Sequence, residues 1–441
     1  MRFLPVLFPL ALGCAAAWHD DLDRLRDDLE TLRARHESAS APDDRGLAEA
    51  VDLDTLVREA RFRNPDLREL AARSRAGLEE VRRAGSLDDP RLKFETEGVP
   101  FRDASLNRAE ANMIGLGQAV PFPGNLSLRS EAALRDAEGM HQMYLERERE
   151  IVARVKRAYF EYYVLTKELE IHREHVGLLE GFEKISEVKF RTGAVSQQDI
   201  LRPQVEQVLL HNEVLVTEQR LGSARAAINV LLHRLPDAPL GPPREIVPVE
   251  ETFDLKELTM RALAARPELK AAELRVRASK AGLTLADREA VLPDFELGVD
   301  YWQVPEEKDA FGAMLAINLP WLTGKKSAEA RRMGHLLRAD EAALDAARNR
   351  VRQEVLDAHL RVEAARKALA LYRAELLPKS GQAVEVSRAS YEKDKASFLE
   401  LLDSERSLRD VKLRYHQSLA SLESAAADLE RAVGADLRRK P

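Results

Sequence analysis

Cysteine is scarce in this sequence of 441 residues, and an excess of basic charge is absent. Cys14 is the single cysteine, which excludes a disulfide within the chain and a zinc site built from thiolates. Lysine and arginine number 68 against 75 aspartates and glutamates, so the formal net charge is −7. A chain without a basic excess cannot neutralise a phosphate backbone, and we therefore expect no nucleic-acid partner.

Motifs of enzyme active sites are missing from the sequence as well. The ten histidines are scattered and include no HExxH pair with the spacing of zinc ligands on a helix. We find no Gly-x-Ser-x-Gly nucleophile turn, no phosphate-binding P-loop and no cluster of histidines with carboxylates. We therefore expect a protein that is not an enzyme and that uses no cofactor and no metal site.

Aromatic residues are few, at 5%, whereas charged residues reach 32% and Ala, Leu, Glu and Arg dominate the composition. This mixture is typical of long helices in contact with solvent. The apolar run Phe3 to Leu12 is too short to cross a bilayer as a helix. With Arg2 before it and small residues after it, this run predicts a secretory signal over residues 1–17.

Two processing sites compete within this signal. Leu12-Gly13-Cys14 resembles the end of a lipobox, although Ala11 stands where that motif prefers leucine, and cleavage there would leave Cys14 as a lipidation site. Cleavage after Ala17 is the alternative, and we favour the lipoprotein. Residues 18–50 follow as an N-terminal helix, with Leu22, Leu25, Leu29 and Leu32 on one face, and a SASAPDD linker.

An internal repeat organises the remaining chain. Asp52 to Leu67 is similar to Asp254 to Leu269 at an offset of 202 residues, and Val120-Pro121-Phe122 is matched by Leu319-Pro320-Trp321. The sequence therefore predicts repeat 1 over 51–250, repeat 2 over 251–435 and a short tail over 436–441. Each repeat is expected to contain a helix, a strand pair, a very long helix, a turn and a returning helix.

The strand pairs are expected at 91–120 and 294–321. Phe295, Leu297, Val299 and Tyr301 alternate with Glu296, Gly298 and Asp300, so one face is apolar and the other small or charged. Runs of this length can cross a bilayer as tilted strands; the alternative is two amphipathic hairpins packed on a helical body. Since four strands cannot close a barrel, membrane strands would require an obligate oligomer.

The long helices are equally distinctive. Asn125 to Phe190 contains no proline and would extend about 100 Å as one helix. The returning arm, Ser196 to His233, contains Pro203, where we expect a kink or a later helix start. The second long helix is expected from Ser327 to Leu377, followed by Pro378 and continuing to Tyr391. A further helix carries Phe398, Leu401, Leu402 and Leu408 at the spacing of a coiled-coil seam.

The turns at the ends of the long helices allow two interpretations. Ser196 and Ser397 lie three residues before Asp199 and Glu400, which is the spacing of a capping box. Capping does not explain Asp403, one turn beyond Glu400. In a ring-shaped oligomer, repeated carboxylates at a tip would form a charged constriction that selects cations. The two roles are compatible.

Over residues 50–435 the chain resembles the TolC-like outer membrane efflux proteins. The resemblance lies in the twofold repeat, in VPFPGNLSLRSEAA and LPWLTGKKSAEA after the strand pairs, and in the tip motifs FRTGAVSQQDILRPQVE and YEKDKASFLELLDSERSL. It implies a mainly α fold with a small β part, made of long antiparallel coiled-coil hairpins plus four transmembrane strands per subunit. In a homotrimer, three subunits would complete a twelve-stranded barrel in the lipid bilayer of the outer membrane.

The resemblance also implies the function. The helices would form a tunnel across the periplasm that closes like an iris, and a periplasmic adaptor at the tips would link it to an inner-membrane pump. The implied gate residues are Tyr391, Glu400, Asp403 and their first-repeat counterpart Asp199. The implied adaptor-docking tips are Thr192, Gly193, Ala194, Val195, Ser196, Asp394, Lys395, Ala396 and Ser397. Asp394 stands where the family usually has glycine, and Ala396 where some members carry a gate-bonding arginine, so the closed-state contacts are expected to differ.

The expected function is passive conduction through an outer-membrane exit duct, with energy from an inner-membrane partner. The alternative from another class is a secreted helical scaffold that never inserts in the membrane. The sequence does not distinguish drugs, metal cations or proteins as the cargo, because a passive duct carries little selectivity.

Overall fold

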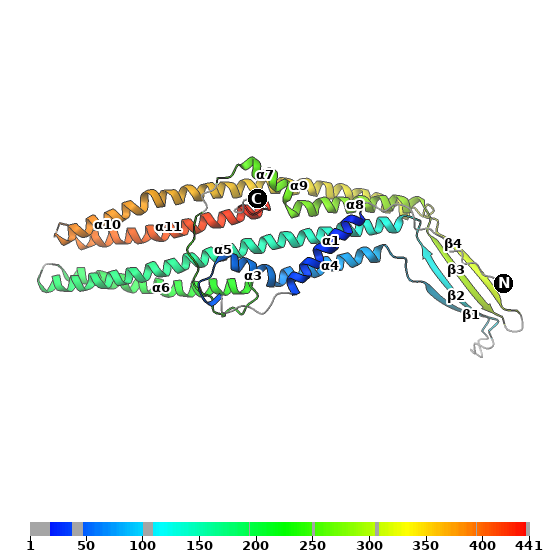
Figure 1. Cartoon of the computed structure of the whole chain (residues 1–441), viewed down its shortest axis with the longest axis horizontal. Helices are drawn as coiled ribbons and strands as arrows, with labels where there is room; N and C mark the ends of the chain where they lie inside the picture. The colour runs from blue at the N-terminus through cyan, green and yellow to red at the C-terminus, as the bar shows by residue number, and fades with distance from the viewer. Residues whose placement is uncertain are drawn as a thin grey trace. The chain divides into compact units, whose positions relative to one another are not determined.

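The computed structural model describes residues 18–37, 47–99, 109–193, 195–248, 252–304, 308–393 and 395–437 (Figure 1). Cys14, Ala194, Asp394 and the SASAPDD linker lie outside these ranges. The chain divides into two compact units. Unit 1 takes in the chain up to Arg33, Leu70–Tyr144 and Glu268–Ala347, and unit 2 takes in Ala34–Glu69, Leu145–Pro267 and the chain from Arg348. Each unit therefore draws on both repeats.

A single four-stranded antiparallel sheet belongs to unit 1. Its strands are β1 (Arg91–Glu97), β2 (Ala111–Val120), β3 (Phe295–Gln303) and β4 (Ala310–Ile317), in that order across the sheet. The central pair joins the two repeats, with Leu116 opposite Val299. The two predicted strand pairs are thus confirmed, and they form one sheet with β1 and β4 at its edges.

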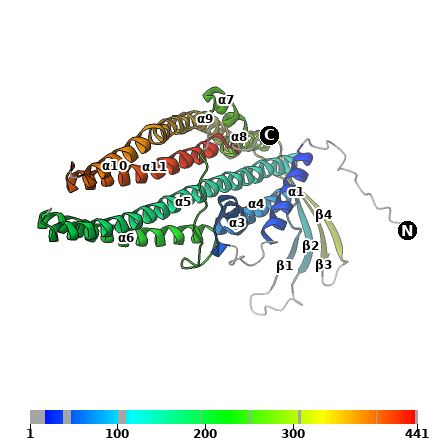
Figure 2. The same cartoon turned by 60° about the vertical axis from the view of Figure 1, so that its left-hand side comes forward.

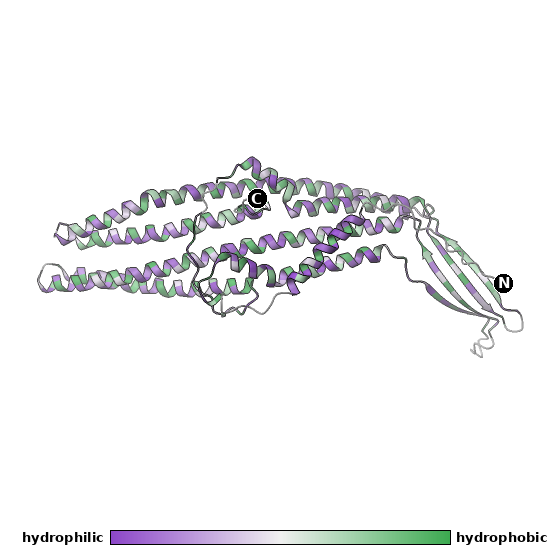
Figure 3. Cartoon of the chain, viewed as in Figure 1, coloured by the Kyte–Doolittle hydropathy of each residue, from purple (hydrophilic) through white to green (hydrophobic). Residues whose placement is uncertain are grey.

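The two faces of the sheet differ sharply, and Figure 3 shows the alternation of hydrophobic and hydrophilic residues along the strands. One face carries large apolar side chains that are exposed, among them Leu92 at 76% and Phe311 at 86%. The opposite face carries charged residues such as Lys93 and Glu296, whose charged atoms lie 3.7 Å apart. Between them it carries the small residues Gly115, Gly117, Gly298 and Gly312, together with the larger Met113, Trp302 and Met314.

Two short helix pairs repeat the same local sequence. α3 (Leu53–Arg63) and α4 (Pro65–Ala84) belong to the first repeat, and α7 (Leu255–Ala265) and α8 (Pro267–Val291) to the second. Asp52 and Asp254 cap their starts by accepting a backbone N–H, at 2.8 and 3.1 Å. In each pair a proline opens the second helix, where its missing N–H costs no helical bond.

The first helical hairpin has the expected length. α5 (Asn125–Arg191) is one helix of 67 residues, and α6 (Gln197–Leu231) returns beside it in both views (Figures 1 and 2). The helix start was expected either at Ser196 with a kink or downstream of Pro203. The later start is wrong, because the helix begins at Gln197 and Pro203 lies inside it. The capping residues at Ser196 and Asp199 fix the start seven residues before the proline.

The second hairpin is interrupted once. α9 (Lys325–Leu371) leads into a π turn, η2 (Tyr372–Leu376), and then into α10 (Leu377–Glu392) and α11 (Phe398–Val433). α9 begins two residues before the expected Ser327, directly after Gly324, whose φ is +69°. The π turn was not predicted. It precedes Pro378, which lacks the N–H that a regular α-helical turn would use.

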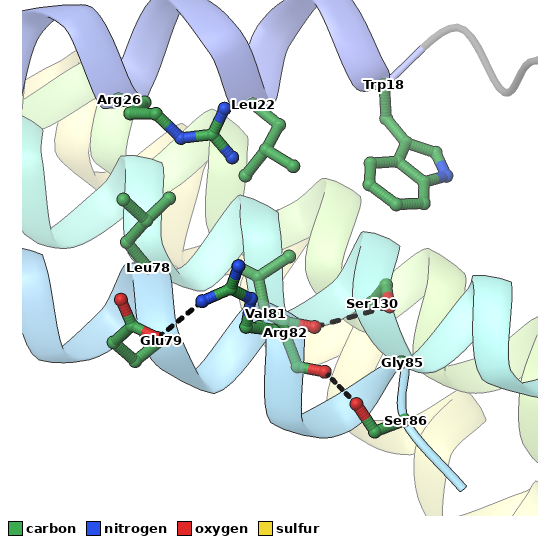
Figure 4. A pocket seen from close by; sticks show the side chains of 10 residues that line it. All are labelled: Trp18, Leu22, Arg26, Leu78, Glu79, Val81, Arg82, Gly85, Ser86 and Ser130. Carbon is green, nitrogen blue, oxygen red and sulfur yellow. Dashed lines mark hydrogen bonds and ion pairs between the residues drawn. The ribbon is translucent and has the colours of Figure 1, made fainter.

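The N-terminal helix is confirmed as α1 (His19–Glu37), and Leu25, Leu29 and Leu32 on its expected apolar face are buried. Within unit 1, Asp21 of α1 accepts a hydrogen bond from Arg135 of α5 at 2.7 Å. Figure 4 shows Trp18 and Leu22 on one side of a pocket of about 390 Å³, with Leu78 and Val81 of α4 opposite. The helix thus packs by its leucines and leaves a small gap at its first turn.

Among the described residues, no helix is both long and apolar enough to cross a membrane.

Candidate gate at the helical tips

The first tip is closed by local hydrogen bonds. Gly193 has a φ of +74°, a left-handed conformation that glycine adopts without strain, and its N–H bonds to the Phe190 carbonyl at 2.9 Å. α6 then starts from Ser196, whose backbone N–H donates to the Asp199 carboxylate at 2.9 Å. Thr192 is exposed and Val195 half-buried at this turn. The expected helix-capping role of Asp199 is therefore confirmed.

The second tip has the same design with different residues. The Lys395 N–H bonds to the Ser390 carbonyl at 2.9 Å and closes the turn. The Ser397 N–H donates to Glu400 at 3.0 Å, and the Glu400 N–H donates back to the Ser397 hydroxyl at 3.3 Å. This reciprocal pair completes the predicted capping box. Ala396, between Lys395 and Ser397, is half-buried.

The carboxylates of the second tip both face solvent. Glu400 is exposed although one of its oxygens is used by the cap, and Asp403 is exposed one turn later on α11. Within the described part of the chain, Asp403 has no hydrogen-bond or ion-pair partner. The structure therefore brings two acidic groups to the surface at one end of the second hairpin. The cap fixes the orientation of Glu400, whereas no bond among the described residues fixes Asp403.

Tyr391 is buried in an apolar cluster that joins the two hairpins of unit 2. Its ring meets Phe398 edge-on at 5.9 Å, and the Lys189 ammonium lies 4.1 Å from the ring centre. The Tyr391 hydroxyl is buried and has no hydrogen-bond partner among the described residues. The remaining members of this tip cluster are Leu179, Phe182, Leu210, Leu401 and Leu402. The tips of both hairpins are thus held together by apolar contacts.

Behind this cluster, a buried charge network connects α6 to α11. Glu206 is 8% exposed and accepts from the Arg406 guanidinium, with an Nε to Oε1 distance of 3.1 Å. Arg409 lies 3.7 Å from Glu206 and 4.0 Å from Glu213. Nearer the tip, Glu405 is 3% exposed and accepts from Arg388 of α10 at 2.8 Å. Charges at core positions link helices of both repeats.

This network was not predicted from the sequence, and the expectation of no cluster of histidines with carboxylates was wrong. His172 lies 3.6 Å from Glu168 on α5 and 3.6 Å from Glu213 on α6. One signal was available: Glu206 lies between Pro203 and Leu210 at the spacing of a buried helical stripe. A charge at such a position requires a buried partner. Its partner in another helix 200 residues away could not be identified from spacing.

His175 lies beside this network and is 3% exposed. Burial lowers its pKa to about 4, and the charge of Arg409 acts in the same direction. The neutral imidazole is therefore the form that the folded tip accommodates. The nearby His172 imidazole is the main cause of a lowered pKa at Glu168.

His175 gives the folded protein an expected loss of stability on acidification. Its folded pKa of about 4 lies below the 6.5 of an unperturbed histidine, so unfolding takes up a proton at intermediate pH. Stability should be full above pH 6.5 and fall as the pH drops towards 4, by at most about 1.4 kcal/mol per pH unit. Thermal unfolding of wild type and His175→Phe at pH 7.5 and 5 measures this. The difference between the two pH values should shrink in the variant.

His211 on α6 is an exposed histidine and serves as the matched control. His211→Phe should leave the pH dependence of the unfolding temperature unchanged. An equal effect of both variants would contradict the assignment to His175.

Metal binding finds no support among the described residues, where no group of three or more His, Cys, Asp or Glu side chains could hold an ion. In the pocket of Figure 4 the polar side chains are engaged locally, with Arg82 3.7 Å from Glu79. There the Ser86 and Ser130 hydroxyls donate to main-chain carbonyls of α4, at 2.8 and 3.3 Å. The tips are therefore the stronger candidate for a functional site.

Comparison with known proteins decides the family. The sequence profile of the family described as "outer membrane efflux protein" matches residues 56–232 and 258–435, well over half of the chain. The chain belongs to the outer membrane efflux protein family. The two matched segments fall one in each repeat, as the predicted duplication requires. Among curated proteins, none matches this outer membrane efflux protein.

Solved structures share its fold. The outer membrane protein VceC of Vibrio cholerae superposes with a TM-score of 0.74 at 18% identity, over 87% of this chain and 96% of that one. CusC gives a TM-score of 0.74 at 17% identity, over 90% and 96% of the two chains. The open-state outer membrane channel MtrE of Neisseria gonorrhoeae gives 0.70 at 19% identity, over 90% and 94%.

The predicted fold class and family are confirmed. This outer membrane efflux protein is mainly helical with a small sheet, and its place is the outer membrane, with the helices extending into the periplasm. Its family consists of transport channels, not of enzymes. The alternative of a secreted scaffold that never inserts does not agree with this family.

Proposed function

We propose that this chain is one subunit of a homotrimeric exit duct that serves a tripartite efflux or secretion system. Each subunit contributes its four strands to a twelve-stranded barrel in the outer membrane. Conduction is passive, and an inner-membrane pump linked through a periplasmic adaptor supplies the energy. The observation that carries the proposal is a four-stranded sheet with an exposed apolar face and two unpaired edges.

The unpaired edges require neighbours. In lipid, the free N–H and C=O groups of β1 and β4 would each cost several kcal/mol, because no water is available to bond them. Pairing β4 of one copy with β1 of the next satisfies both edges and closes the sheet when the ring is complete. Three copies give twelve strands, enough to close a barrel of four-stranded units.

The aromatic residues of the sheet support this orientation. Tyr301 and Phe311 lie 5.2 Å apart at one end of the β3–β4 hairpin, and Phe122 and Phe295 lie 6.3 Å apart at the other. Aromatic girdles at both ends of an apolar band are typical of outer-membrane barrels. The residues between them, such as Val299 at 60% exposure, would face lipid.

The helices also present apolar surface for neighbouring copies. On α6 an exposed stripe recurs at the spacing of one helical face, and it consists of Leu201, Val205, Val208, Leu209, Leu215 and Val216. In unit 1 a groove of about 880 Å³ is lined by Met140 and Met143 of α5, both exposed. Apolar patches of this extent mark interaction sites. A homotrimer would cover them.

The gate is proposed at the tips. Three copies would bring Glu400 and Asp403 into a ring of six carboxylates, and Asp199 would add a third set on the first hairpin. Such a ring selects cations, and its side chains narrow the opening. We assign Tyr391 to the same gate, because it packs against Leu401 and Leu402 in the tip cluster and its hydroxyl has no hydrogen-bond partner among the described residues.

The adaptor would dock on the exposed turns of the tips. The first docking turn comprises Thr192, Gly193, Ala194, Val195 and Ser196, and the second comprises Asp394, Lys395, Ala396 and Ser397. Small side chains dominate the first turn, which allows a partner helix to approach the backbone closely. Lipidation of Cys14 would add a membrane anchor to each subunit.

Removing the carboxylates of the second tip is expected to open the duct. Glu400→Ala combined with Asp403→Ala should raise single-channel conductance in planar bilayers, because the shorter side chains widen the constriction. It should also reduce the preference for cations, because the trimer loses six negative charges there. Conductance and reversal potential in a salt gradient measure the two effects.

Glu161→Ala with Glu341→Ala serves as the control, since both residues are exposed carboxylates on α5 and α9, about 30 residues or more from the tip turns in sequence. The control should conduct like wild type. Unchanged conductance and selectivity in the tip variant would show that the gate lies elsewhere. A protein that forms no channel at all would contradict the proposed duct.

A further inference from the structure

The second long helix contains one residue more than the first. Asn125 and Lys325 begin α5 and α9, each directly after a glycine with positive φ, and they are 200 positions apart. Arg191 and Glu392 end α5 and α10, and they are 201 positions apart. The additional residue therefore lies within the second helix.

The structure accommodates this residue as the π turn Tyr372–Leu376. There the Leu377 N–H bonds to the Tyr372 carbonyl, five residues back instead of four. Because a π turn absorbs one inserted residue, the helix on either side keeps the register of an uninterrupted helix. Pro378 follows at once. Its ring would collide with the Ala374 carbonyl in a regular turn, and it offers that carbonyl no N–H.

No buried side chain anchors the π turn. None of the residues of the π turn is buried, and the nearest buried apolar side chains are Leu369 before it and Val384 after it. Two polar bonds at the turn are local to the helix. Lys379 donates to Glu375 at 2.8 Å, and the Ser380 hydroxyl donates to the Leu377 carbonyl at 3.2 Å. A segment with few buried contacts and a broken ladder opens and bends at low cost.

We propose that the π turn and Pro378 form the hinge at which α10 and the second tip bend when the duct opens, while α5 stays straight. This inference rests on the proposed function, since it assigns a mechanism to the same gate. α10 carries Tyr391 beyond the hinge and leads through the turn to Glu400 and Asp403. A bend at the hinge therefore displaces the gate residues of the second hairpin together.

A shortened helix tests the hinge. Deleting Ala374 together with Pro378→Ala restores the length of the first helix, so a continuous α-helix can form without a change of register at the tip. In the full-length protein, we expect this variant to open about tenfold less often in planar bilayers than wild type. Pro378→Ala alone keeps the extra residue and should have a smaller effect of the same sign.

Amide exchange gives a second measurement that is independent of conduction. In wild type, exchange at residues 372–380 should be faster than at residues 171–179, the matching stretch of α5, and the deletion should slow it. If the deletion slows exchange but leaves the opening frequency unchanged, the hinge does not serve the gate. If exchange in wild type is no faster than in α5, the stretch is not a hinge. A wild type that never conducts would refute the duct, and exchange would still decide the hinge.

Discussion

Val299→Arg should prevent assembly of the protein in the outer membrane. Val299 is at the centre of β3, on the apolar face, and is 60% exposed. An arginine near the midplane of a membrane barrel costs about 2–4 kcal/mol per strand position, and a trimer would carry three of them. We expect little or no trimer in outer-membrane extracts, measured by gel filtration of the detergent-solubilised protein.

Met314→Arg is the matched control for this variant. Met314 lies one row from Val299 in the neighbouring strand β4, but on the opposite face, across from Gly298. In the proposed barrel that face borders water, so the same charge should be tolerated and the trimer should form. Equal loss of both variants, or normal assembly of Val299→Arg, would contradict the assignment of the apolar face to lipid.

Glu206→Ala should loosen the joint between the two hairpins. The substitution leaves Arg406 and Arg409 without their shared carboxylate in a largely buried setting. Removing one partner of a buried pair costs about 3–5 kcal/mol, and because Arg406 is partly exposed we expect about 2–3 kcal/mol here. A lower unfolding temperature and faster proteolysis of the tips should accompany a higher resting conductance.

Glu218→Ala removes the carboxylate of a comparable ion pair, Arg173–Glu218 at 2.7 Å, which is exposed on both sides. Such a pair contributes about 0–1 kcal/mol, so this control should behave like wild type in all three measurements. If Glu206→Ala also leaves the unfolding temperature, proteolysis and conductance unchanged, the buried network does not hold the hairpins together. Glu206→Leu with Arg406→Leu should recover part of the stability, because it leaves fewer unpaired buried charges.

The sequence predicts the elements of this fold well because their signals are local. Alternation along Phe295 to Tyr301 defines a strand with two unlike faces, and the absence of proline from Asn125 to Phe190 defines one helix. The duplicated start at Asp52 and Asp254 shows two equivalent units. The need for partner strands at the sheet edges also follows from the number of strands alone.

What could not be predicted depends on contacts between distant residues. The partnership of Glu206 with Arg406 requires knowing which helices are neighbours, and the unpaired hydroxyl of Tyr391 depends on the packing of four helices. The π turn could not be predicted for another reason. An additional residue can be accommodated at the tip or anywhere in the helix, and Pro378 marks its position only once the bond pattern is seen.

Pro203 shows how local signals compete. Its ring favours a helix start close to it, whereas the Ser196 and Asp199 cap favours a start seven residues earlier. The cap determines the start. The proline is buried within the helix, and Glu206 and Leu210 follow it along the same buried face.

The glycines of the sheet have a consequence for what the duct can recognise. A side chain at position 115 would collide with the Asp300 carboxylate, and one at position 298 would crowd Met314. The wall opposite the apolar face is therefore low around these glycines, although Met113, Trp302 and Met314 stand on it beside Lys93 and the carboxylates. A wall with so little side-chain relief would select cargo by diameter and charge, and chemical identity would be selected before the cargo enters the duct.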